Sequence, residues 1–478
     1  MRPNSLLQKL LNPAPVKRFN PSLCTRDRIH LALEKIATQP VLSSRDDLSA
    51  YARDESGLVD YWPDFVVHVK NTQQVSEILK LAQSEGMPVT PRGAGSGKSG
   101  GCVCVAGGVS LVLSNMNQIL NVYPKHFYAQ VEPGVITGEF QQAVESVGRF
   151  YPPDPASLAY CTLGGNAATN AGGPRAVKYG VTQHYVLGLE AVLPTGEVIQ
   201  VGKRTAKGVV GYDLTSLIVG SEGTLAVITA LTLQIVARPA AVMTALLGFS
   251  DLQTATLAVS LLASSSITPV ALELLDKAAL SALGADVYQW LHAEAQAALI
   301  VEIEAPDACL ETEMDRLLTC VASVLVGEPQ VACTPQQRAQ VWALRRAVSE
   351  ALKKKARYKL SEDIAVPVGH ISELCAHIQQ VAEHNHVAYA IYGHAGDGNL
   401  HVNVLWNDEL EEPYVLNVLE SIFVAAVRLG GTISGEHGVG LLKHRFIHLE
   451  QTPAVLAVQR QLKKNWDPCG ILNPGKKI

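Results

Sequence analysis

The chain has 478 residues, of which 47% are hydrophobic and 17% charged, and its formal net charge is −5. This length allows two or three domains with large cores. The acidic balance and an aromatic content of 6% argue against a protein that binds nucleic acid through a basic field or stacking platforms. Nine cysteines without a CxxC pair argue against an iron–sulfur cluster or zinc ribbon and indicate a reducing compartment.

The first 60 residues are predicted to be a helical, partly flexible segment. Residues 1–26 contain basic side chains and no acid, with leucines at positions 6, 7, 10 and 11. This pattern fits either a plain basic extension or an organelle transit peptide. We therefore expect a cytoplasmic protein, peripheral to a membrane at most, or a mitochondrial one if the segment is a transit peptide. No segment is typical of a membrane span, because the apolar uncharged run 252–272 contains several polar residues and Pro269.

The region 61–239 is predicted to be a first domain of mixed strands and helices. Strands are expected at 65–70, 87–93, 109–114, 128–135, 187–193 and 196–202. Helices are expected at 136–147 and at 72–85, where Thr72 would be the cap and apolar residues recur at helical spacing.

The pattern changes after Pro239, and the region 240–425 is predicted to be a second domain. Strands at 243–249, 269–275 and 298–305 alternate with helices near 252–264 and 308–324. This order indicates an antiparallel sheet with helices on one face, and therefore an α+β protein. The tail, 426–478, is expected to be largely helical.

Two glycine-framed clusters carry the chemistry of the C-terminal half. His394 and His401 flank a Gly-Asp-Gly-Asn turn, and the adjacent pair Glu436 and His437 follows between glycines. Two imidazoles and one carboxylate are a common shell for a divalent metal that leaves positions open for substrate. A second histidine beside such a shell can act as a base. The same glycines could instead form an ordinary tight hairpin with histidines at its ends.

A glycine-rich loop, PRGAGSGKSGG (91–101), follows the strand at 87–93. Glycine permits positive φ and close approach, so such a loop can turn its backbone N–H groups toward a pyrophosphate. It matches neither the Walker pattern nor a GxGxxG that opens a helix. Taken alone, it could equally be a flexible surface loop.

The loop is followed in order by PPDPAS (152–157), TLGGNAATNAGGP (162–174), GYDL (211–214) and GSEGTLAVIT (220–229). Together these motifs resemble the FAD-binding domain of the vanillyl-alcohol oxidase / p-cresol methylhydroxylase flavoenzymes. GHAGDGNLH and GEHGVG resemble the C-terminal part of FAD-linked oxidases in the branch of D-lactate dehydrogenases, the glycolate oxidase flavin subunit and D-2-hydroxyglutarate dehydrogenases. The resemblance implies a two-subdomain FAD-binding domain (61–239), an antiparallel-sheet substrate or cap domain (240–425), and a segment (426–478) that returns to complete the active site.

The resemblance assigns FAD to three groups of residues in the first domain. The pyrophosphate loop corresponds to Arg92, Gly93, Ala94, Gly95, Ser96 and Gly97. The positions that enclose the flavin correspond to Asp154, Pro155, Gly164, Gly165, Asn166, Asn170, Gly172 and Gly173. The segment near the adenine and ribose corresponds to Glu222, Gly223, Thr224, Val227 and Ile228. Because Ser96 stands where some members carry a histidine that tethers the flavin, we expect FAD to be held non-covalently.

In the C-terminal half, the resemblance makes His394, His401 and Glu436 the ligands of a divalent metal, zinc or manganese. His437 would then be the active-site base, and Asn403 an amide that contacts the substrate.

The same resemblance points to Arg345 as the cation that holds the substrate carboxylate, with Arg346 as the neighbouring alternative. Hydroxyglutarate-type members carry a lysine where this chain has Ser361, although Lys359 is close by. A second carboxylate would need a cation at this place, so the difference favours a monocarboxylate.

The implied function is FAD-dependent oxidation of D-lactate, glycolate or a similar small 2-hydroxy acid to the 2-oxo acid. A D-2-hydroxyglutarate dehydrogenase is the alternative within the branch. An alkylglycerone-phosphate synthase type of transferase, or a flavin subunit that is inactive without its partner, are alternatives of another class. A separate acceptor would take the electrons: a quinone, a cytochrome, an electron-transfer flavoprotein or an iron–sulfur subunit. A homodimer is compatible with all of these.

Overall fold

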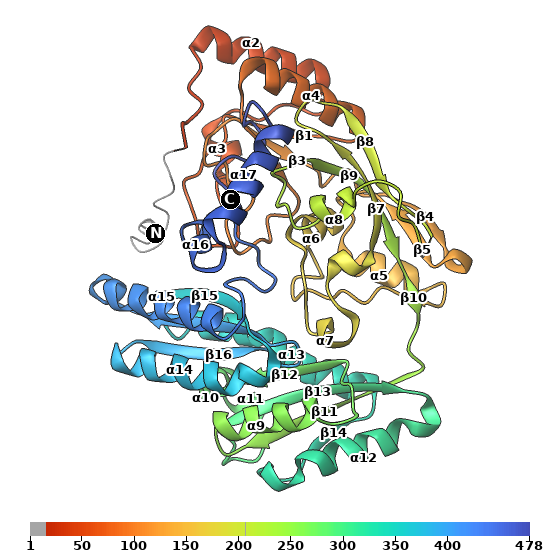
Figure 1. The fold of residues 1–478 in the computed structure, drawn as a ribbon, viewed down its shortest axis with the longest axis vertical. Coiled ribbons are helices and arrows are strands. Elements are labelled where there is room, and N and C mark those ends of the chain that lie inside the picture. Colours follow the sequence, from red (N-terminus) through yellow and green to blue (C-terminus); the bar gives the residue numbers. More distant parts are fainter. Residues whose placement is uncertain (1–15, 206) are drawn as a thin grey trace. The chain divides into compact units, whose positions relative to one another are not determined.

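The computed structural model describes residues 16–205 and 207–478, which form two compact units (Figure 1). Of the described residues, the first unit comprises 16–171, 181–205, 207–238 and 436–478, and the second comprises 172–180 and 239–435. The sequence placed the last boundary at 426, whereas the second unit extends to Gly435. The leucines at positions 6 to 11 of the proposed transit peptide lie outside the described residues.

A parallel sheet forms one part of the first unit. Its strands run in the order β1 (Phe65–His68), β3 (Val109–Val112) and β2 (Val89–Arg92). Helices α2 (Leu23–Ile36) and α4 (Thr72–Glu85) contribute to the core beside it. The cap of α4 is Asn71 rather than Thr72, because the Asn71 side chain accepts the N–H of Gln74. A short helix, α3 (Arg45–Leu48), precedes β1.

An antiparallel sheet forms the other part of the first unit. Its order is β4 (Ile119–Tyr123), β5 (Tyr128–Val131), β9 (Val227–Gln234), β7 (Val186–Val192) and β8 (Val198–Gly202). The short strands β6 (Arg149–Phe150) and β10 (Val236–Ala237) pair separately. Helices α5 (Thr137–Glu145), α6 (Leu163–Thr169) and α8 (Leu214–Ile218) connect these strands. Strand β4 was not predicted from the sequence. It lies at the edge of this sheet, and none of its residues is fully buried.

The second unit contains a seven-stranded antiparallel sheet. Its order is β14 (Gln330–Ala332), β11 (Ala241–Phe249), β13 (Ala297–Ala305), β12 (Ala271–Leu275), β16 (Ala388–His394), β17 (Asn399–Trp406) and β15 (Tyr358–Ala365). The helices of this unit are α7 (Ala176–Tyr179), α9 (Leu252–Ala263), α10 (Lys277–Leu283), α11 (Ala285–Tyr288), α12 (Leu310–Val321), α13 (Pro335–Lys353), α14 (Ile371–His384) and α15 (Glu412–Arg428).

Helices cover both faces of the seven-stranded sheet. Ile300 of β13 lies in a core cluster with residues of α10 and α13. Its neighbours Leu299 and Val301 point to the opposite face, because successive strand residues alternate, and they are fully buried as well. Helices α9 and α12, whose residues are absent from that cluster, also contact β13, so the structure adds a second helical layer to the single one that the sequence indicated. The face covered by α10 and α13 is the one that carries the polar residues described below.

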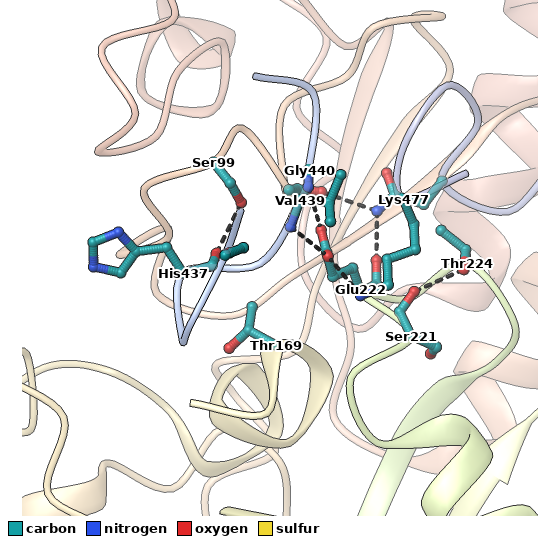
Figure 2. A network of polar contacts seen from close by, with 12 residues as sticks. Ser99, Thr169, Ser221, Glu222, Thr224, His437, Val439, Gly440 and Lys477 are labelled. Carbon is teal, nitrogen blue, oxygen red and sulfur yellow. Dashed lines mark hydrogen bonds and ion pairs between the residues drawn. The ribbon is translucent and has the colours of Figure 1, made fainter. Parts of the chain in front are cut away.

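The C-terminal segment is held on the first unit by a buried carboxylate (Figure 2). Glu222 accepts the backbone N–H of Val439 at 2.9 Å and of Gly440 at 2.7 Å. Its side chain also pairs with Lys477 at 3.3 Å. The hydroxyl of Ser99 donates to the carbonyl oxygen of His437 at 2.9 Å. The GEHGVG motif is thus fastened to the GSEGT motif and to the glycine-rich loop.

Helices α16 (Ile447–Glu450) and α17 (Pro453–Trp466) complete the C-terminal segment. Lys463 of α17 donates to the carbonyl oxygens of Thr224 and Leu472, and Val89 at the start of β2 pairs with Leu472. Within the described part of the chain, no helix combines the length and the apolar character needed to cross a bilayer.

We expect Glu222→Gln to loosen the GEHGVG motif. An amide offers one acceptor oxygen where the carboxylate serves two backbone donors and a lysine, and each hydrogen bond to a charged group contributes about 1.5–3 kcal/mol. Hydrogen exchange followed by mass spectrometry should show the amides of Val439 and Gly440 exchanging about tenfold faster or more. Lys477→Met, which removes only the partly exposed ion pair, is the matched control and should have a smaller effect. Unchanged exchange in Glu222→Gln would contradict this account of the network.

Candidate active site and metal centre

The hairpin β16–β17 places its two histidines on one face of the sheet. Tyr392 pairs directly with His401, and His394 lies two residues further along β16 on the same side. The two imidazoles are in contact, with ring centroids 5.1 Å apart and an edge-to-face arrangement. Gly398 in the connecting turn has a φ of +83°, and a Cβ there would overlap the carbonyl oxygen of Val366. Glycine at this position is therefore a requirement of the turn.

Glu273 of β12 is the direct cross-strand neighbour of His394 and is completely buried. Its Oε1 lies 2.5 Å from Nδ1 of His394, and its Oε2 accepts the Nε–H of Arg345 at 2.5 Å. Burial by itself would raise the pKa of this carboxyl, but Arg345 and His394 lower it to about 2. Glu273 is therefore ionised at neutral pH. Because a carboxylate only accepts, Nδ1 of His394 donates to Glu273, which leaves Nε2 as the nitrogen through which this ring could bind a metal.

Glu436 lies close to the two histidines because the backbone just before it is hydrogen-bonded to the sheet. The preceding residue, Gly435, donates its N–H to the carbonyl oxygen of Asp363 at 3.4 Å. Asp363 is the partner of His401 in the β15–β17 ladder. His394, His401 and Glu436 each offer one ligand atom, and these atoms lie within 4.8 Å of one another. This donor set, with both histidines almost fully buried, fits a divalent cation that keeps coordination positions for a substrate.

Arg345 extends from α13 toward the same face of the sheet. It is buried, whereas Arg346 is exposed, so the structure favours Arg345 of the two sequence candidates. Its guanidinium lies over the ring of Tyr392 at 4.8 Å as well as against Glu273. Only the Nε–H is used there, and the terminal N–H groups donate to no other described residue. A planar guanidinium with free terminal donors can bind a carboxylate in a bidentate manner.

Asn403 lies two residues after His401 on the same face and is fully buried. Its amide nitrogen donates to the carbonyl oxygen of His401 at 3.2 Å. Its side-chain oxygen has no hydrogen-bond partner in the part of the chain that the structure describes. A buried acceptor without a partner is costly in a finished core, so this atom is suited to meet a hydroxyl or another donor of a ligand.

His437 follows Glu436 directly, and its Nε2 lies 3.9 Å from a carboxylate oxygen of that residue. Its backbone is fixed by Ser99, and Figure 2 shows its imidazole pointing away from the Glu222 network. The side chain is 15% exposed. A partly exposed imidazole beside a carboxylate can accept a proton, and the carboxylate stabilises the cation that forms.

The glycine-rich loop after β2 has the character of an anion-binding loop. The backbone N–H groups of Gly95, Ser96 and Gly97 donate to no other described residue. The side chain of Arg92 lies against the loop at Gly95. Its guanidinium donates to the carbonyl oxygen of Arg53 and to the sulfur of Cys102, and it fills the space where a Cβ of Gly95 would lie. Free amides on a glycine-rich loop fit the pyrophosphate of FAD.

Other residues that the sequence assigned to FAD have clear structural contacts. Asn166 donates to Thr137, and Asn170, at the left-handed end of α6, binds Gln183. The carboxylate of Glu222 holds the C-terminal segment as described above.

The remaining members of that set are placed as follows. Ala94 and Gly93 open the loop, Gly164 and Gly165 begin α6, Gly223 and Thr224 precede β9, Val227 and Ile228 begin it, and Asp154 and Pro155 follow β6. Gly172 and Gly173 belong to the segment 172–180 of the second unit.

Sequence reasoning missed Glu273, although it predicted the strand that carries it. The signal was present, because a single acid inside the apolar run PVALELL is rarely buried unless it is paired. It also missed Asp363, which is buried beside His401 and accepts from Ser434 at 3.3 Å. In both cases the partner is distant in sequence, so spacing alone could not identify it.

Two family models match the chain: "FAD binding domain" over residues 63–202 and "FAD linked oxidases, C-terminal domain" over residues 238–477. The chain is 38% identical to the glycolate oxidase subunit GlcD of Bacillus subtilis, over 89% of this chain and 91% of that protein. It is 33% identical to a D-lactate dehydrogenase of Anaerostipes hadrus, over 93% of this chain and 95% of that protein. A D-2-hydroxyglutarate dehydrogenase of Stutzerimonas stutzeri is 31% identical, over 91% and 95%.

Among solved structures, p-cresol methylhydroxylase superposes with a TM-score of 0.80 at 15% identity, over 97% of this chain and 98% of that one. An alkyldihydroxyacetonephosphate synthase superposes with a TM-score of 0.71 at 18% identity, over 97% of this chain and 86% of that one. These likenesses confirm the predicted α+β fold, with an FAD-binding domain and an antiparallel-sheet domain. The chain belongs to the FAD-linked oxidases of the p-cresol methylhydroxylase / vanillyl-alcohol oxidase fold and is an FAD-linked oxidoreductase related to glycolate oxidase and D-lactate dehydrogenase.

Proposed function

We propose that this protein oxidises a small 2-hydroxy acid of the D-lactate or glycolate type to the 2-oxo acid, with non-covalent FAD and a divalent ion, zinc or manganese. The observation that carries the proposal is the cluster of His394, His401 and Glu436 on the sheet face that also holds Arg345. When bound, the ion would polarise the substrate oxygens and FAD would accept the hydride.

The residues of the chain bind and orient the substrate. The terminal N–H groups of Arg345 hold the carboxylate, because Glu273 fixes the guanidinium by its Nε–H and leaves those donors available. The side-chain oxygen of Asn403 accepts a hydrogen bond from the substrate. Such positioning accounts for a large part of the rate enhancement in any reaction of a bound substrate.

His437 removes the proton of the substrate hydroxyl at a ring nitrogen. The carboxylate of Glu436, 3.9 Å from Nε2, stabilises the imidazolium that results. The hydrogen bonds of Ser99 to the His437 carbonyl oxygen and of the Val439 N–H to Glu222 fix the backbone that carries this base.

A monocarboxylate is favoured over hydroxyglutarate. Ser361 pairs with Asn403 across the sheet and offers no charge. Lys359, on the same side of β15, directs its ammonium to the carbonyl and hydroxyl oxygens of Ser349 at 3.1 and 2.8 Å. The similarity to a D-2-hydroxyglutarate dehydrogenase keeps that substrate as the runner-up.

A similar protein is named as a subunit of glycolate oxidase, which supports a second element of the proposal. We propose that a separate partner receives the electrons: an iron–sulfur subunit, a cytochrome, a quinone or an electron-transfer flavoprotein. An alkyldihydroxyacetonephosphate synthase shares the fold. If this chain were instead a transferase without net redox turnover, it would pass no electrons to an acceptor.

Anaerobic titration of the purified, FAD-loaded protein with a panel of 2-hydroxy acids tests the function. D-Lactate or glycolate should bleach the flavin absorbance, since hydride transfer requires no second substrate, and an artificial dye acceptor should restore it. D-2-Hydroxyglutarate should bleach the flavin more slowly, because Ser361 offers its second carboxylate no charge and Lys359 donates to Ser349. Absence of bleaching by every acid in the panel would refute the proposal.

His437→Ala should leave FAD bound and lower kcat by at least about 10²-fold, which is the typical contribution of a positioned base. Steady-state kinetics with a dye acceptor and the flavin spectrum provide the two readings. His448→Ala, an exposed histidine on α16, is the control and should keep full activity. A His437→Ala enzyme with near-normal turnover would remove this residue from the mechanism.

Treatment with a chelator should abolish activity, and added Zn²⁺ or Mn²⁺ should restore it, because the cluster would lose the charge that polarises the substrate. Glu436→Gln should give the same loss without recovery, since it removes the one anionic ligand. Metal content measured by plasma mass spectrometry should follow activity in both cases. Full turnover in a protein shown to be metal-free would exclude the metal role.

A further inference from the structure

The carboxylate of Glu273 contacts both a proposed metal ligand, His394, and the proposed carboxylate-binding arginine, Arg345. Its Oε1 faces Nδ1 of His394 and its Oε2 faces Nε of Arg345, each at 2.5 Å. We infer that Glu273 is a positioning residue that holds His394 in the tautomer needed for metal binding and, at the same time, turns the terminal donors of Arg345 toward the substrate. This inference rests on the proposed function and adds to it a residue that does not itself touch metal or substrate.

The first part follows from the two nitrogens of an imidazole. A neutral ring carries its proton on one nitrogen and binds a metal through the other. Glu273 accepts the proton at Nδ1 and so presents Nε2 as the ligand atom. A carboxylate behind a histidine ligand also raises the basicity of the ligand and fixes the plane of its ring, and the loss of such a partner typically costs about 10–100-fold in metal affinity.

The second part follows from the burial of Arg345. Its side chain is 9% exposed, and Glu273 is its only carboxylate partner among the described residues. Because the contact uses Nε–H, the edge formed by the two terminal nitrogens stays available. One carboxylate thereby positions both the substrate-binding arginine of α13 and the metal-binding histidine of β16, which come from different parts of the chain.

The competing explanation is that Glu273 only balances the buried charge of Arg345. The sheet supplies a control for this view in Glu302 of β13, which lies on the same face and is also buried. Its Oε2 accepts from Thr244 and from Trp342, one turn before Arg345 on α13, each at 2.8 Å. Glu302 is thus a buried acid that holds the same helix and touches none of the proposed site residues.

The first experiment measures the affinity of metal-stripped, FAD-loaded protein for Zn²⁺ and Mn²⁺ by isothermal titration calorimetry. In Glu273→Gln the amide oxygen will face the charged Arg345, so the NH₂ group faces Nδ1 of His394 and favours the tautomer protonated at Nε2. The Kd should therefore rise by about 10–100-fold. Glu302→Gln should leave the Kd unchanged. Equal affinity in wild type and Glu273→Gln overturns the inference.

A second pair of variants excludes a mere effect on folding. Arg345→Met keeps Glu273 at His394 and should retain the wild-type Kd for Zn²⁺, although its KM for the 2-hydroxy acid should rise. Glu273→Leu/Arg345→Met removes both charges, a change that buried ion pairs often tolerate. Circular dichroism verifies that it is folded, and its Kd should be weakened about 10–100-fold. Wild-type affinity in this double variant would show that Glu273 only balances charge.

Metal binding by the wild-type protein distinguishes a failure of the proposed function from a failure of the inference about Glu273. If wild type binds neither Zn²⁺ nor Mn²⁺, the metal role in the proposed function fails, and the inference about His394 fails with it. If wild type binds and Glu273→Gln binds equally well, the inference fails while the proposed function stands.

Discussion

The contact on which the site depends is the buried carboxylate of Glu273 between Arg345 and His394. A guanidinium and an imidazole inside a sheet-and-helix core would each be strongly unfavourable without a partner. Glu273 compensates both, and its direct pairing with His394 in the β12–β16 ladder leaves little freedom for rearrangement. Because Arg345 comes from α13, the same contact also holds that helix in register over the sheet. This one interaction therefore contributes both to stability and to the geometry of the proposed site.

A second constraint lies in the segment that carries Glu436 and His437. Before these residues, Thr432 pairs with Ala365 and Gly435 donates to Asp363 at the end of the β15 strand. After them, Val439 and Gly440 donate to Glu222. The two residues with proposed chemical roles thus lie in a short stretch whose backbone is hydrogen-bonded on both sides. A Cβ at 435 or 440 would overlap a neighbouring group, and Gly438 has a φ of +81°, a conformation that favours glycine. The GEHGVG motif is explained by these close approaches as much as by its acid and imidazole.

Much of this could be predicted from the sequence, for identifiable reasons. The strands at Phe65–His68 and Ala297–Ala305 and the helix at Thr72–Glu85 have strong periodic patterns, and each formed where expected. The grouping of His394, His401 and Glu436 was predicted from residue types and from family resemblance, and the three ligand atoms do lie together. Glu273 could not be predicted, because its partners are separated from it by 72 and 121 positions and only the sheet order brings them into contact. The contacts of Glu222 with Val439 and Gly440 could not be predicted either, since a motif does not reveal that a side chain faces another part of its own chain.

The central claim is that His394, His401 and Glu436 hold a divalent ion that receives a 2-hydroxy acid. The most direct measurement is a crystal structure of the FAD-loaded protein with Zn²⁺ and D-lactate, with diffraction data collected on either side of the zinc absorption edge. The account predicts one anomalous peak bonded to the three side chains, with the lactate carboxylate in contact with Arg345. An anomalous peak elsewhere, or lactate bound away from these residues while the three side chains carry no metal, would contradict it.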